Sequence, residues 1–428
     1  MNALDKPMDI QSHPSRWNAY LIFLLAASFY LYEFILQVAP SVMADDMMNA
    51  FHINAAGFGI ISAFYFYSYA PMQLPAGVLF DRYGPRKLMT IALIICGIGS
   101  IFFAATDSLV TAALGRFLIG VASAFSFIGV LILVSRWFPH HQFALLAGIA
   151  QLMSSLGAMF GQIPLAKLIE VVGWRNASFI LGALGFCLAA LVALIIRDYP
   201  VPPSKIAPRR PLFEEWQRLA AVCRRPHTWL IGIYAFTIWT PIAVFAALWG
   251  VPYLQAKYQI SIITASGLCS MIWLGIGIGS PLLGWLSDQF ETRRLALALS
   301  AALGFVAVIL LLYCSLPLSW MYGVLLLLGL GAGGQTVSFA VVKDYNPPKW
   351  VGTASGFNNL SVLLGGAIFQ PLVGILLNHG QTTVVNNITL YDMSTYNRAL
   401  LVMPCCYFIS FVVAFFLRGK RGNELKAK

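Results

Sequence analysis

The sequence predicts an all-α membrane protein with twelve transmembrane helices, arranged as two pseudo-symmetric six-helix bundles. Three features support this fold class: a shortage of charge, long apolar runs and an internal repeat. Of the 428 residues, 59% are hydrophobic and 10% are charged, whereas a soluble domain carries about 25% charged residues. Apolar runs repeatedly reach the roughly 20 residues that a helix needs to cross a bilayer.

Windows of membrane-spanning length place six helices on each side of a polar central stretch. In the first half we expect spans near residues 17–41, 54–79, 88–106, 109–135, 143–166 and 177–196. In the second half we expect them near 228–254, 262–286, 295–314, 318–342, 352–377 and 397–417. The predicted domains are therefore an N-terminal bundle (1–196), a cytoplasmic linker (197–227) and a C-terminal bundle (228–428).

The basic residues indicate which side of the membrane each loop faces. If the N-terminus is cytoplasmic, all Lys and Arg residues fall at the cytoplasmic side except five: Arg116, Lys167, Arg175, Lys257 and Arg398. Such a bias predicts a bacterial inner-membrane protein with both termini in the cytoplasm. It also explains the net charge of +11 without a nucleic-acid partner, because the basic residues form no stripe on a soluble domain.

The central linker contains one further predicted element. Residues 213–222 place apolar Phe213 and Trp216 opposite charged Glu214, Glu215 and Arg218, a pattern typical of a short amphipathic helix. Such a helix would lie on the inner leaflet or pack against the cytoplasmic ends of the bundles.

The two halves of the chain repeat one another at a nearly constant offset. Gly77 and Asp81 correspond to Gly284 and Asp288, and Gly148 and Gly157 correspond to Gly356 and Gly365. Gln162 is matched in the same way by Gln370. An ordered series of matches indicates duplicated halves, and a repeat of this kind predicts a substrate site near the midplane between them.

The loop after the second predicted span carries the most specific motif in the chain. It runs from Gly77 to Lys87 and has a degenerate copy in the second half; its key residues are Gly77, Asp81, Arg82, Gly84, Arg86 and Lys87, then Gly284, Asp288, Arg293 and Arg294. The motif resembles the signature loop of the major facilitator superfamily (MFS). Arg116 with Gly120, and Gly148 with Gly157 and Gly161, resemble two further motifs of that family, although Gln162 replaces a usual proline.

The resemblance covers nearly the whole chain and implies the MFS fold with alternating access. The cavity would be lined by spans one, four, seven and ten, and the signature loops would gate the cytoplasmic side; a purely structural role for them is the alternative. More loosely, Tyr32-Glu33-Phe34 and Gly356-Phe357-Asn358-Asn359 are similar to bacterial relatives of the lysosomal dipeptide transporter and to phagosomal nutrient transporters.

Two charges lie deep within predicted spans, where charge is costly and marks function. Glu33 is sixteen residues into the first span, about 24 Å along its axis at about 1.5 Å per residue. Arg116 lies about 10 Å from the outer end of the fourth span on the same scale. We expect these two side chains to pair or to lie close together, with Glu33 as a proton-coupling site and Arg116 binding an anionic group of the substrate. A purely structural ion pair is the alternative.

Uncharged polar and aromatic residues complete the predicted cavity. Tyr30 and Gln37 share a helical face with Glu33. The second half contributes Tyr234, Trp239, Thr240, Gln335 and Asn359, although each of these groups alone could serve packing instead. An aromatic wall with amides suits an organic solute that forms hydrogen bonds.

These features predict a secondary active transporter, coupled to protons, of a small polar solute such as an amino acid, a short peptide or a nucleoside. The sequence shows no phosphate-binding loop, catalytic constellation or metal cluster, so we expect no enzyme activity and no cofactor. The expected partners are the bilayer, a small-molecule substrate and protons, and the expected state is a monomer. The alternatives are an exporter of lipophilic or siderophore-like compounds and a non-transporting membrane sensor.

Overall fold

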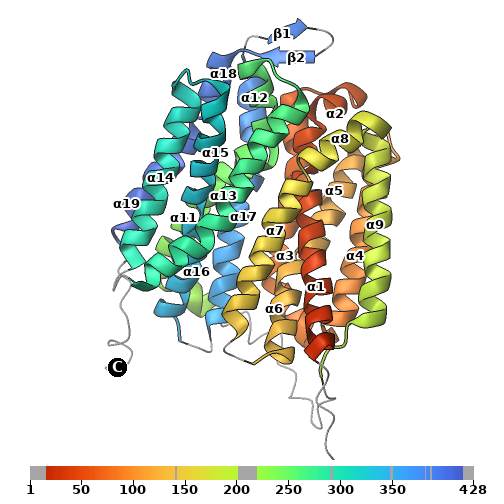
Figure 1. Ribbon diagram of the computed structural model, residues 1–428, viewed down its shortest axis with the longest axis vertical. Coiled ribbons are helices and arrows are strands. Elements are labelled where there is room, and N and C mark those ends of the chain that lie inside the picture. The colour runs from red at the N-terminus through yellow and green to blue at the C-terminus, as the bar shows by residue number, and fades with distance from the viewer. Residues whose placement is uncertain are drawn as a thin grey trace, which may run out of the picture.

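The protein is a bundle of long helices in two halves that stand side by side (Figure 1). The structure is a computed structural model, which describes residues 16–139, 142–200, 219–289, 293–347, 350–380, 382–385 and 388–417. The start of the first helix and the end of the last lie at one end of the bundle, here called the terminal end. A small β-hairpin marks the opposite end, here called the hairpin end.

The N-terminal half contains the first six membrane-spanning segments. They are built from α1 (Arg16–Val38), η1 (Ala39–Val42), α2 (Ala44–Ala50), α3 (Ala55–Tyr83), α4 (Pro85–Ala104), α5 (Leu109–Ser123), α6 (Ser126–Trp137), α7 (Phe143–Phe160), α8 (Ile163–Val172) and α9 (Trp174–Ile195). The pairs α1 and η1, α5 and α6, and α7 and α8 each form one segment. The short helix α2 joins the first segment to the second at the hairpin end.

The C-terminal half repeats this arrangement and adds a hairpin. Its elements are α11 (Pro226–Pro241), η3 (Ile242–Trp249), α12 (Gly250–Tyr258), α13 (Ile262–Gln289), α14 (Arg293–Tyr313), α15 (Leu318–Ala332), α16 (Gly334–Tyr345), α17 (Val351–Asn378), β1 (Thr382–Val385), β2 (Ile388–Tyr391), α18 (Met393–Ala399) and α19 (Val402–Ala414). The antiparallel strands pair Thr382 with Tyr391 and Val385 with Ile388. This hairpin is a local addition to the all-α fold that the sequence predicts.

The twelve predicted helices are present. Eleven segments of the described chain are long and apolar enough to cross a membrane, and α3, with 29 residues, is the twelfth. The helix α3 packs between α5 and α17, since an added Cβ at Gly120 of α5 would meet the Tyr65 carbonyl and one at Gly59 would meet the Gln370 carbonyl. The protein is therefore a multi-pass membrane protein.

Several spanning segments change helix type, the first at its hairpin end and the seventh near its middle. Proline has no N–H group to donate to the preceding turn, and Pro40 lies in η1 while Pro241 immediately precedes the π-helical η3. By the offset of 207 positions, η1 corresponds to the last four residues of η3. The α5–α6 break and the α15–α16 break at Gly333 are equivalent in the same way.

The packing of α17 on α3 shows that the two halves diverge toward the terminal end. Along one face of α17, a Cβ at Gly374 would collide with the Ala55 carbonyl, and one at Gly366 would lie 2.8 Å from the Phe66 ring. Further toward the terminal end, a Cβ at Gly356 would lie 4.0 Å from the nearest atom, the Gln73 carbonyl oxygen, and one at Gly352 would meet nothing within 4 Å. The halves are thus in contact at the hairpin end and separated at the terminal end.

One predicted element cannot be compared with the structure. Of the predicted amphipathic helix at 213–222, residues 213–218 lie outside the described part of the chain. Residues 219–223, which are described, are helical.

Candidate functional site

Glu33 is a fully buried carboxylate in the part of α1 nearer the hairpin end. Its side chain is 0% exposed, and Oε1 accepts a hydrogen bond from the Tyr65 hydroxyl of α3. The second oxygen, Oε2, has no hydrogen-bond partner among the described residues. A buried carboxylate with one oxygen that lacks a partner is costly when it is ionised.

Arg116 is buried on α5 and contacts the same tyrosine. Its guanidinium lies 5.0 Å from the centroid of the Tyr65 ring, and Nη1 donates to the Leu36 carbonyl at 2.8 Å. Leu36 is one helical turn from Glu33. The two charges therefore lie in one cluster, but they form no ion pair with each other among the ion pairs of the described chain. Tyr65 contacts both side chains instead: its hydroxyl donates to Glu33 and its ring lies against the Arg116 guanidinium.

A narrow crevice, with room for about one water molecule, lies beside Arg116 within the N-terminal half. It is lined from α1, η1, α4, α5 and α9 by residues that include Leu36, Pro40, Ser100 and Ser178. The Arg116 Nε is buried and has no hydrogen-bond partner among the described residues. A guanidinium forms strong, often bidentate, hydrogen bonds to carboxylate and phosphate groups. This cation is thus able to bind an anionic group.

Tyr65 is not among the site residues that the sequence predicts, and it lies in an aromatic run of α3. The run Tyr65-Phe66-Tyr67-Ser68-Tyr69 covers the whole circumference of the helix. Tyr65 is 0% exposed, whereas Tyr67 is 43% exposed. The pattern of the run does not reveal which tyrosine faces Glu33, because that depends on how α3 is rotated against its neighbours.

The other predicted residues of the first half lie close to this cluster along α1. The Tyr30 ring stacks on Phe127 of α6 with centroids 5.0 Å apart, and its hydroxyl donates to Gln151 Oε1 of α7 at 3.4 Å. Gln37, one turn beyond Glu33, is also buried. These contacts place Tyr30 among α1, α6 and α7.

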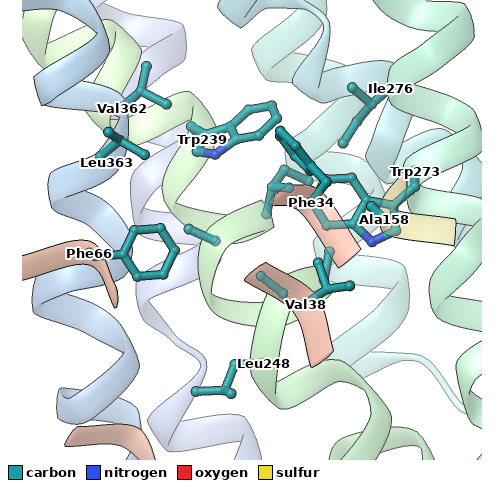
Figure 2. Close-up of a cluster of buried hydrophobic side chains, with 14 of the residues drawn as sticks. Phe34, Val38, Phe66, Ala158, Trp239, Leu248, Trp273, Ile276, Val362 and Leu363 are labelled. Atoms are coloured by element: carbon teal, nitrogen blue, oxygen red, sulfur yellow. The ribbon is translucent and has the colours of Figure 1, made fainter. Parts of the chain in front are cut away.

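An apolar cluster fills the interface between the halves next to Glu33. Figure 2 shows Phe34 of α1 beside Trp273 of the other half, and Phe66 of α3 nearer Leu363 of α17. The rings of Phe34 and Trp273 meet edge to face with centroids 5.8 Å apart. Because Phe34 follows Glu33 directly, α1 presents its carboxylate to α3 and the next side chain to the opposite half.

The predicted residues of the second half fall into two groups. Trp239 belongs to the interface cluster, and Gln335 and Asn359 are half-buried. By contrast, the Tyr234 hydroxyl donates to the Leu297 carbonyl of α14 at 3.0 Å, and Thr240 Oγ1 donates to the Phe236 carbonyl at 2.7 Å. The structure therefore places Tyr234 and Thr240 in packing within their own half and does not bring them together with Glu33.

The basic residues of the first signature loop contact their own half. Arg86 donates from its backbone N–H to Asp198 Oδ1 at 2.8 Å and from Nε to the Ala193 carbonyl at 2.8 Å. Arg82 and Lys87 lie over the Tyr83 ring. Gly84 has a φ of 78°, a conformation that favours glycine, so it makes the turn from α3 into α4. The Asp81 side chain lies outside the described part of the structure.

The second copy of the loop forms the same kind of local network. Arg293 pairs with Asp288 at 3.1 Å and with Asp344 at 2.5 Å, and Arg294 lies over the Phe415 ring. The predicted role of these loops is to hold the halves together at the cytoplasmic side. Within the described residues, the basic groups of both loops contact only the half to which they belong, which agrees with the separation at the terminal end.

The comparison with protein families decides the classification. The model of the Major Facilitator Superfamily matches residues 21–370 and, in a second alignment, 242–427. This chain belongs to the major facilitator superfamily. It is therefore a transporter-family protein and not an enzyme, as the sequence predicts.

Curated members of the superfamily resemble the chain over most of its length. The probable galactarate/D-glucarate transporter of Escherichia coli is 21% identical, over 88% of this chain and 89% of its own. The probable sulfoacetate transporter of Cupriavidus necator is 23% identical, over 81% and 85%. Among solved structures, a bacterial homologue of the human lysosomal transporter Spinster, inward-facing and unoccupied, superposes with a TM-score of 0.70 at 17% identity, covering 94% of this chain and 97% of that one.

Proposed function

We propose that the protein is a secondary transporter of a small organic anion, driven by protons that bind at Glu33. The observation that supports this proposal best is the state of Arg116: a buried cation beside a crevice, with one N–H group free and no ion pair to Glu33. Leaving a buried cation without a counter-charge is costly. An anionic substrate would supply that counter-charge during transport.

The relatives support the same class of substrate. They are named as transporters of galactarate and D-glucarate, of sulfoacetate and of D-galactonate, all of which carry carboxylate or sulfonate groups. The amino acids, short peptides and nucleosides expected from the sequence find no support among these names. Because the relatives are only 21–23% identical, the proposal specifies the class of substrate and not the compound.

The two charges have separate roles in this proposal. Arg116 binds the acidic group of the substrate with its planar fork, while Glu33 carries the proton. Protonation removes the negative charge of Glu33, which would repel an incoming anion, so proton and anion bind favourably together. We place both termini in the cytoplasm of a bacterial inner membrane, so that the open terminal end faces inward, and uptake is the proposed direction.

The proposal is tested by proton flux into liposomes. The purified protein is reconstituted with a pH-sensitive dye inside, and pools of sugar acids and sulfonates are compared with pools of amino acids, dipeptides and nucleosides. We expect the acid pools alone to acidify the interior. Glu33→Gln should abolish acidification while anion exchange continues, and Arg116→Lys should weaken both by about one to two orders of magnitude.

Lys257 provides a matched cation control for Arg116. It is partly buried in the C-terminal half and donates to the carbonyls of Leu311 and Cys314, so Lys257→Met removes a partly buried cation at the end of the seventh segment, outside the proposed site. That variant should transport normally. A signal from the amino-acid or nucleoside pools with none from the acids would overturn the proposal, and anion binding without flux would indicate a sensor.

A further inference from the structure

The seventh spanning segment contains a long π-helical stretch at the boundary between the halves. The η3 helix covers eight residues, Ile242–Trp249, whereas π-helical turns are rare, short and frequently found at functional sites. Two prolines flank it, Pro241 before and Pro252 after. Each removes a backbone N–H donor from the helical ladder, which accounts for the change of helix type. All eight residues are buried.

Two glutamines from equivalent places in the repeat donate to carbonyls of this stretch. Gln370 Nε2 of α17 donates to the Ala243 carbonyl at 2.8 Å. Gln162 Nε2, at the α7–α8 break, donates to the Ala246 carbonyl at 3.4 Å and to Ser41 Oγ at 3.2 Å. Both side chains are buried. The sequence repeat therefore supplies the π-helical stretch with one amide from each half.

The two amides differ in what they connect. Gln370 and η3 belong to the same half, so their bond can persist as the halves move. Gln162 belongs to the opposite half, so its bond to η3 exists only while the halves meet near the hairpin end. The same region holds a second contact across the interface, between the rings of Phe58 and Trp249 with centroids 5.4 Å apart.

We propose that Gln162 is a positioning residue of the transport cycle, whose amide holds the π-helical stretch of the seventh segment against the N-terminal half while the hairpin end is closed. When the hairpin end opens, this bond breaks, whereas the bond from Gln370 remains. Gln162 thus favours one of the two conformations, and Gln370 stabilises the stretch in both. The proposal depends on alternating access in the superfamily and not on the substrate class proposed above.

The proposal is tested by measuring how far apart the halves are at the hairpin end. Spin labels are attached at Asn49 of α2 and Gln255 of α12, in a variant whose seven native cysteines are replaced, and distances are measured in lipid nanodiscs without substrate. We expect wild type to show mainly the short distance. In Gln162→Met, which keeps the side-chain length and loses the donor, the ratio of long to short distances should rise about fivefold, equal to about 1 kcal/mol for one hydrogen bond.

Gln370→Met is the matched control, because it removes the equivalent amide and leaves the bond between the halves intact. Its distance ratio should equal that of wild type. A Gln162→Met distribution identical to wild type overturns the proposal, and so does an equal shift in Gln370→Met, which would indicate a general weakening of the π-helical stretch. If Gln162→Met does not fold, Gln162→Leu is measured instead, because this apolar side chain of smaller volume likewise has no group that could donate to the Ala246 carbonyl.

Discussion

At the scale of single residues, Tyr65 is the side chain that contacts both buried charges, Glu33 and Arg116. A direct ion pair between Glu33 and Arg116 would neutralise both and leave neither ready for a proton or an anion. Tyr65 instead donates its hydroxyl to the carboxylate and presents its ring to the guanidinium, an arrangement that attracts a cation without giving it a counter-charge. Both charges are partly satisfied and both retain capacity for another partner.

This arrangement predicts that the Tyr65 hydroxyl matters for proton coupling and its ring for Arg116. Tyr65→Phe keeps the ring and removes the donor, so the ionised form of Glu33 loses a hydrogen bond worth about 1.5–3 kcal/mol. We expect uptake driven by a pH gradient to fall about tenfold to a hundredfold, with much less effect on anion exchange, which moves no net proton. The measurement compares gradient-driven uptake with counterflow in the same liposomes.

Tyr69→Phe is the control for this prediction. Tyr69 packs edge to face on Tyr65 with centroids 5.4 Å apart and loses a hydroxyl of the same kind, but Glu33 accepts its hydrogen bond from Tyr65. Uptake by the control should be near wild type. Equal losses of uptake and exchange in Tyr65→Phe would show that the hydroxyl serves the structure and not the coupling.

The sequence predicted the charged members of this cluster but not the residue that joins them. Glu33 and Arg116 stand out because charge within a spanning helix is costly and rare. Tyr65 does not, since any of three tyrosines in its run could have faced Glu33. The rotation of α3 is set by contacts with distant segments, such as that of Gly59 with the Gln370 carbonyl, and a one-dimensional pattern contains no record of them.

At the scale of helices, the glycines of α17 indicate which end of the interface is open. Glycine permits close helix approach, and Gly374 and Gly366 are in such contact with α3 while Gly352 is not. Gly352 nevertheless lies one turn beyond Gly356, on the face of α17 that packs against α3. We infer that α17 approaches α3 at this position when the terminal end closes.

A side chain at position 352 should therefore hinder one conformation and spare the other. Gly352→Val meets open space in the conformation described here but would obstruct closure of the terminal end. We expect normal folding and thermal stability with turnover reduced about tenfold or more. The measurement is the initial rate of uptake, together with the melting temperature in detergent.

Gly323→Val is the matched control, because a Cβ at Gly323 also meets nothing within 4 Å. Gly323 is exposed near the start of α15, at the hairpin end of the bundle. Its valine variant should transport as wild type does. If the two variants behave alike, the approach of α17 to α3 at position 352 is not part of the cycle.

At the scale of the whole molecule, the repeat predicts two halves but not how they are placed. The offset between Gly77 and Gly284, or between Gln162 and Gln370, is the same in every conformation, so it cannot distinguish an open end from a closed one. The placement comes from contacts between halves, such as Phe34 with Trp273. These contacts differ in free energy by small amounts between conformations. They join residues of different halves, so they are absent from the periodicity of either half.

If transport requires the halves to move as rigid bodies, a covalent bond between them should stop it. An added Cβ at Gly277 of α13 would lie 3.5 Å from the Ser155 Cβ of α7, within the range that a disulfide spans. In a variant without native cysteines, Gly277→Cys with Ser155→Cys should form a disulfide on oxidation, arrest uptake and recover when reduced. Uptake before and after each treatment is the measurement, with loss of thiol labelling reporting the bond.

A second cysteine pair tests whether arrest requires a bond between the halves. A Cβ at Gly182 of α9 would lie 3.4 Å from the Ser100 Cβ of α4, and both helices belong to the N-terminal half. Gly182→Cys with Ser100→Cys should therefore oxidise as readily and leave uptake nearly unchanged, because the half would move as one unit. Arrest by this second bond would mean that α4 and α9 move against each other during transport. The cycle would then include rearrangement within a half as well as motion between halves.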